Sequence, residues 1–168
     1  MKYALILLFS LLHFSIAAQT SKVAVRYSSD SSIVGTGLVE NTIQIGLWKF
    51  YTAKTNTLVT EGIFKNGLRD GQWTSFHPNG KRKELADYRD GKLFGPARFF
   101  DVNGFLVKDM IFQDSILVGK YIEYYGSTEQ DFYVDPSQVK LEGNYAVGKK
   151  AGQWLSYFPE GELAVREF

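Results

Sequence analysis

The chain has 168 residues, with 19 basic and 18 acidic side chains, and it contains no cysteine. This length suits a single domain, and the balance of charge gives no basic field that would favour nucleic acid or anionic lipid as a partner. The lack of cysteine excludes disulfides and thiolate metal sites.

The first 18 residues have the pattern of a cleavable secretory signal peptide. Lys2 precedes an apolar run from Ala4 to Ile16, and small residues follow before Gln19. The run is interrupted by polar residues and is shorter than the roughly 20 apolar residues of a transmembrane helix. We therefore expect residues 1–18 to be removed and the rest of the chain to be exported, either to the periplasm or outside the cell.

Residues 19–45 are expected to form an N-terminal capping hairpin and a partial repeat. Val23, Val25 and Tyr27 alternate with other residues, as in a half-buried strand, and the polar SSDSS that follows predicts a turn. The phrase GLVENTIQI at 37–45 aligns with GIFKNGLRD at 62–70. A cap is expected here because the end units of a repeat array lack one neighbour.

Residues 46–168 read as five repeats of about 24 residues. The units begin at Gly46, Gly71, Gly95, Gly119 and Gly152, with spacings of 25, 24, 24 and 33. The longest spacing contains nine additional residues, which lie within an insertion loop at about 126–138. Turn phrases such as HPNG and KNG divide each unit into two short strands. The predicted fold is all-β: a meander of antiparallel hairpins that forms one elongated, twisted sheet.

Aromatic residues recur at three positions of the unit. The position two residues after the glycine carries Trp48, Trp73, Tyr121 and Trp154, with Ala97 in the third unit. A second set lies three residues further on, and a third set ends the return strand at Phe64, Tyr88, Phe112, Tyr145 and Phe168. We expect these rings to stack on neighbouring repeats. The five glycines are expected to provide either a positive φ or room for a tryptophan over a bare Cα, rather than a phosphate cradle.

The phrase G-x-W-x-x-[FY]-x-x-N-G, followed by an aromatic return strand and x-[ND]-G, resembles the MORN-repeat variant of the YwqK-like antitoxin family. The resemblance covers about residues 37–168 and rests on five copies in register. It implies a meander of antiparallel hairpins and a role in binding rather than in chemistry. This sequence departs from the pattern at Ala97, at Asn56 with Thr57, and in the insertion.

His77 is the only histidine in the predicted exported chain, and no serine, cysteine or second histidine forms a catalytic set with it. We expect a solvated residue beside a turn, at a position that varies freely between the units. No catalytic residue, cofactor or metal site is predicted. The tryptophans could also stack on sugars, although a ladder that stabilises the sheet needs the same residues.

The insertion is the one feature that the repeat does not require. It is the best candidate for partner binding, through Tyr125, Asp131, Phe132, Tyr133 and Asp135. The alternative is that this loop folds back and covers the sheet through Phe132.

The favoured function is an exported, non-enzymatic scaffold that binds another protein at the cell envelope. The sheet face, the insertion or the edge of the final strand could bind the partner, the last by strand pairing. The alternatives are a YwqK-like protein that neutralises a toxin, and a glycan-binding module.

Overall fold

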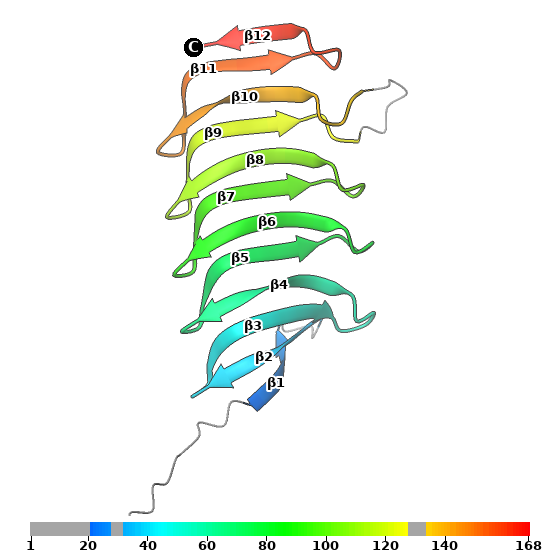
Figure 1. Ribbon diagram of the computed structural model, residues 1–168, viewed down its shortest axis with the longest axis vertical. Coiled ribbons are helices and arrows are strands. Elements are labelled where there is room, and N and C mark those ends of the chain that lie inside the picture. The colour runs from blue at the N-terminus through cyan, green and yellow to red at the C-terminus, as the bar shows by residue number, and fades with distance from the viewer. Residues whose placement is uncertain (1–20, 28–31, 128–133) are drawn as a thin grey trace, which may run out of the picture.

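The computed structural model describes residues 21–27, 32–127 and 134–168 of the chain, and Figure 1 shows its architecture. The described residues contain twelve strands and no helix. The strands are β1 Ser21–Tyr27, β2 Ile33–Glu40, β3 Ile43–Thr52, β4 Leu58–Lys65, β5 Leu68–Phe76, β6 Arg82–Arg89, β7 Lys92–Phe100, β8 Leu106–Gln113, β9 Ile116–Tyr124, β10 Val139–Ala146, β11 Lys149–Tyr157 and β12 Leu163–Glu167.

These strands form one antiparallel sheet in which every strand pairs with its neighbours in sequence, from β1 at one end to β12 at the other. The sheet does not close into a barrel, and the hairpins stack along the long axis of the molecule (Figure 1). The predicted all-β meander is therefore confirmed.

Two kinds of turn alternate along the chain, each with the backbone that its sequence requires. In HPNG the Gly80 amide donates to the His77 carbonyl at 2.9 Å, and Gly80 has a φ of 83°. This is the predicted type I turn followed by a left-handed residue. At the other edge Asn66 and Gly67 have φ values of 51° and 77°, as in the type I′ turns that join tightly paired strands.

The repeat glycines interrupt the strand pairing. All five have a positive φ, between 64° and 99°. Between β4 and β5, for example, Glu61 pairs with Thr74 but Ile63 pairs with Asp70, so β5 contains a bulge at Gly71. Positive φ is thus the property that these glycines supply, since an L side chain is strained there.

The side chains buried most completely lie in one row across the sheet. Trp48 is 0%, Trp73 2% and Trp154 3% exposed. In the third unit Ala97 occupies this row between its cross-strand partners Ala86 and Met110. We call the side of the sheet that carries this row the tryptophan face, and the other side the opposite face.

The third aromatic set lies at the predicted end of the return strand, opposite a repeat glycine, in four units, but the prediction is wrong for Phe168. Phe64, for example, pairs with Gly46, and Tyr145 pairs with Gly119. In the last unit the pairing of Trp154 with Glu167 places Phe168 one residue short of the position opposite Gly152. Phe168 is 95% exposed and does not extend the ladder.

Candidate functional site

A glycine on the preceding strand seats each tryptophan. A Cβ added at Gly37, Gly62 or Gly143 would overlap the indole of the tryptophan eleven residues later, which is Trp48, Trp73 or Trp154. In the third unit Ala86 lies eleven residues before Ala97. The glycine and the tryptophan that packs over it are thus both replaced by alanine in the same unit. This constant spacing of eleven residues is visible in the sequence and is the signal from which these glycines could be predicted.

The tryptophan rings are enclosed by neighbouring side chains. The Phe64 ring lies edge-on to Trp73 at 5.0 Å between centroids, and the Arg69 guanidinium lies 4.3 Å from the centroid of the Trp73 ring. The Trp48 and Trp73 indoles donate to backbone carbonyls at 3.0 and 3.1 Å. Because these rings are enclosed, they are core residues and offer no open platform on which a sugar could stack.

His77 links its repeat to the next one, which corrects the prediction of a solvated and freely varying residue. It is half-buried, and its Nε2 lies 2.9 Å from the Phe100 carbonyl oxygen. A carbonyl only accepts, so Nε2 carries a proton and donates. The matching residue of the fourth unit, Tyr125, donates its hydroxyl to the Tyr157 carbonyl at 2.7 Å.

Asp101 has the same place in the third unit and also reaches the next turn. Its carboxylate accepts hydrogen bonds from the backbone and the hydroxyl of Ser127, and from the amides of Asn103 and Phe105. Burial raises the pKa of Asp101, but these hydrogen bonds outweigh it and hold the pKa below its ordinary value. Three different side chains therefore join consecutive turns, which explains why the position has no constant residue type.

Two of the five insertion residues proposed to bind a partner lie in the described part of the chain. Tyr125 makes the hydrogen bond to Tyr157, and the Asp135 carboxylate accepts from the Ser137 amide and hydroxyl at 2.8 and 2.7 Å. The hydrogen bonds from Ser137 lower the pKa of Asp135. Both residues thus have a structural role in the turn, whereas Asp131, Phe132 and Tyr133 lie outside the described residues.

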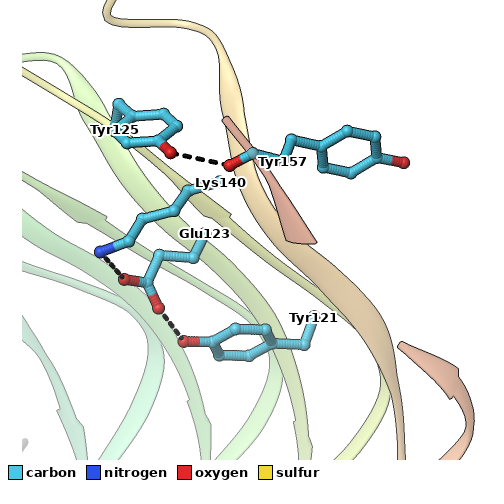
Figure 2. A network of polar contacts seen from close by, with 5 residues as sticks. All are labelled: Tyr121, Glu123, Tyr125, Lys140 and Tyr157. Carbon is cyan, nitrogen blue, oxygen red and sulfur yellow. Dashed lines mark hydrogen bonds and ion pairs between the residues drawn. The ribbon is translucent and has the colours of Figure 1, made fainter. Parts of the chain in front are cut away.

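A polar network adjoins the aromatic packing in the unit that carries the insertion (Figure 2). Tyr121 donates its hydroxyl to Glu123 at 3.0 Å, and the other Glu123 oxygen lies 3.4 Å from the Lys140 ammonium. Burial, followed by the hydrogen bond to Glu123, raises the pKa of Tyr121 far above its ordinary value. Tyr121 therefore stays protonated, as a buried donor in the core.

The opposite face has a charged row and exposed apolar side chains. Cross-strand ion pairs join Lys49 to Glu61, Arg98 to Asp109 and Lys120 to Glu142, at 3.0, 3.3 and 3.4 Å. Beside this row Leu47 is 54%, Ile63 49% and Ile111 41% exposed. Partly exposed ion pairs of this kind contribute only about 0–1 kcal/mol each, so this face adds less to stability than the tryptophan face does.

A hollow of about 680 Å³ opens between strands β4 and β7. The carboxylates of Asp70, Asp87 and Asp90 line it, together with Lys65, Tyr88, Arg89 and Phe94. Within the described ranges, no group of three or more histidine, cysteine or acidic side chains could hold a metal ion. The part of the chain that the structure describes also has no helix that could span a membrane.

Comparison of the chain with models of known protein families gives no match, and comparison with curated proteins gives none either.

Proposed function

We propose that the chain is an exported, non-enzymatic repeat scaffold that binds another protein at the cell envelope. The observation that carries this proposal is the unequal use of the two sheet faces. The tryptophan face packs its large rings against one another, whereas the opposite face leaves Leu47, Ile63 and Ile111 between 41% and 54% exposed. Exposed apolar side chains that adjoin one another, as the paired Leu47 and Ile63 do, are typical of protein-binding surfaces.

The resemblance to MORN-variant repeats supports the same proposal, because those repeats imply binding rather than catalysis. The role found for His77 agrees with a non-enzymatic chain, since its Nε2 is engaged by the Phe100 carbonyl. The glycan alternative loses its strongest support, because Trp48, Trp73 and Trp154 are buried.

Affinity capture from envelope extracts tests the proposal. The wild-type chain should recover a partner in a stoichiometric amount, and the variant L47K/I63K should lose it because two cations replace the exposed apolar pair. A matched control is V102K/F105K, which changes two exposed apolar residues in the turn between β7 and β8. Failure of the wild-type chain to recover any partner would count against the scaffold role.

A chain from which residues 127–135 have been excised separates the two candidate surfaces. If the insertion binds the partner, this variant should lose it while the remaining sheet stays folded. If the opposite face binds the partner, recovery should be unchanged.

A further inference from the structure

We propose that the opposite face binds an amphipathic helix of the partner protein. In this helix an arginine is flanked on both sides by an apolar residue that also faces the sheet. This inference rests on the proposed function and specifies the surface and the chemistry of its partner. The surface, which we call the docking strip, consists of Leu47, Ile63, Asp70, Asp87, Pro96 and Ile111.

The docking strip has apolar ends and an acidic centre. Leu47 pairs with Ile63 across β3 and β4, and Pro96 pairs with Ile111 across β7 and β8. All four of these side chains are exposed. Asp70 and Asp87 lie on the two strands β5 and β6 that separate the apolar pairs.

The repeat shows that the scaffold does not need these two carboxylates. Asp70 precedes a repeat glycine, and the matching residues of the other units are all apolar: Ile45, Phe94, Val118 and Ala151. Asp87 follows the position of the tryptophan seat, where three of the other four strands carry Leu38, Ile63 and Ile111. Both aspartates thus lie at positions where most of the other units carry apolar residues.

Neither carboxylate has a partner among the residues that the structure describes. Both are half-buried, and no hydrogen bond or ion pair is formed by Asp70 or Asp87 with any residue that the structure describes. A partly buried carboxylate without a hydrogen bond or an ion pair is unfavourable, because it loses water without gaining a direct partner. The stability of the fold therefore does not explain why two such residues lie on adjacent strands, whereas a cationic group of a partner would.

The hollow favours a cationic side chain from outside. Three carboxylates line it against two cations, and one of these cations, the Arg89 guanidinium, lies 3.6 Å from the centroid of the Phe94 ring. The described carboxylates do not form a metal-binding group, so an organic cation suits them better. Arginine fits best, because its planar fork pairs with carboxylates through two hydrogen bonds.

The spacing between the apolar and acidic parts of the docking strip matches the spacing of residues along an α-helix. Neighbouring strands lie about 4.8 Å apart, so each pair of strands places its side chains about 10 Å from those of the next pair. Seven residues of an α-helix rise by about 10.5 Å. A helix that lies along the stack of hairpins in Figure 1 can therefore place an apolar residue, an arginine and a second apolar residue at seven-residue intervals over the strip.

The test uses a labelled helical peptide of about 18 residues, with leucine, arginine and leucine at seven-residue intervals, and fluorescence anisotropy. The wild-type chain should bind this peptide, and a peptide with glutamate in place of the arginine should bind at least about tenfold more weakly, since a desolvated charge pair is lost. The variant D70I/D87I carries residues that sister units already use and should lose binding to the same extent. The variant D70N/D87N removes both negative charges with little change of shape and should lose binding of the arginine peptide to the same extent as D70I/D87I.

A matched control is E160Q/E162Q, which removes two acidic charges from the last hairpin turn and should leave the affinity unchanged. The inference is overturned if the wild-type chain does not bind the arginine peptide, or if D70I/D87I binds it equally well. Envelope capture keeps the two proposals apart. A partner recovered equally by wild type and D70I/D87I removes the docking strip and leaves the scaffold role intact, whereas a wild-type chain without a partner contradicts the scaffold role itself.

Discussion

Replacement of Gly62 by alanine tests the packing of the repeat most sharply. The new Cβ would overlap three atoms of the Trp73 indole, well inside the van der Waals separation of about 3.5 Å. The ring cannot move aside freely, because Phe64, Tyr88 and Arg69 lie against it. Overpacking of a core typically costs about 1–3 kcal/mol, and we expect G62A to lie near 3 kcal/mol.

A double-mutant cycle isolates this contact. W73A alone should cost about 3–5 kcal/mol, as other large-to-small core changes do. In the W73A background, G62A should cost nothing or stabilise by about 0.5–1 kcal/mol, because alanine loses less backbone entropy than glycine in a strand. The third unit already carries this combination as Ala86 and Ala97.

Urea denaturation followed by far-UV circular dichroism measures all four proteins without relying on the fluorescence of Trp73. The expected coupling energy between the two sites is about 3 kcal/mol. If G62A destabilised the chain equally with and without the indole, the seat would not be the reason for glycine at this position.

Three further predictions concern the turns. H77A removes the hydrogen bond to the Phe100 carbonyl and should lower the free energy of unfolding by about 1 kcal/mol, whereas a purely solvated histidine would give no change on urea denaturation. Asp101 has a lowered pKa in the folded chain, so its contribution is present above the ordinary aspartate pKa and is lost as the pH falls through the folded value; D101N should flatten this part of the acid-stability curve, and an unchanged curve would refute the assignment. D135A removes the acceptor for Ser137 and should loosen only that turn, which amide hydrogen exchange would detect as faster exchange near 135–138; faster exchange across the sheet would contradict a local role.

The hairpin architecture could be predicted because turn chemistry is local. A two-residue turn with positive φ at both positions needs residues such as Asn66 and Gly67, and a type I turn with a left-handed fourth residue needs Gly80. These requirements can be seen in a few consecutive letters and recur in most of the turns, although the turn at Asp114 and Ser115 has positive φ at both positions without a glycine.

Relations between strands were harder to predict. The contact between Gly62 and the Trp73 indole depends on the register of β4 and β5, which the bulge at Gly71 alters. The reason for glycine at position 62 can therefore be seen only once the two strands are paired. The prediction that Phe168 extends the third aromatic set ignored a difference in spacing. Phe168 lies 16 residues after its repeat glycine, whereas the matching residues of the other uninterrupted units lie 17 or 18 residues after theirs.

The linking position of the turns was missed for a different reason. His77, Asp101 and Tyr125 share a geometric role but no chemical class, so a comparison of residue types makes the position look free. The docking strip shows the converse case. The repeat identifies Asp70 and Asp87 as exceptions among mostly apolar residues, but only the folded sheet shows that neither has a partner in the described part of the chain.

Photo-crosslinking tests the central claim, that a protein docks on the face opposite the tryptophans. The chain contains no cysteine, so a single introduced cysteine can carry a photoreactive label at one known place. Gln72 alternates with the buried Trp73 and therefore lies on the opposite face, whereas Glu84 lies two residues from Ala86 on the tryptophan face. Labelled Q72C should crosslink to the partner in envelope extracts, and labelled E84C should not. Crosslinks from E84C without any from Q72C would contradict docking on the opposite face.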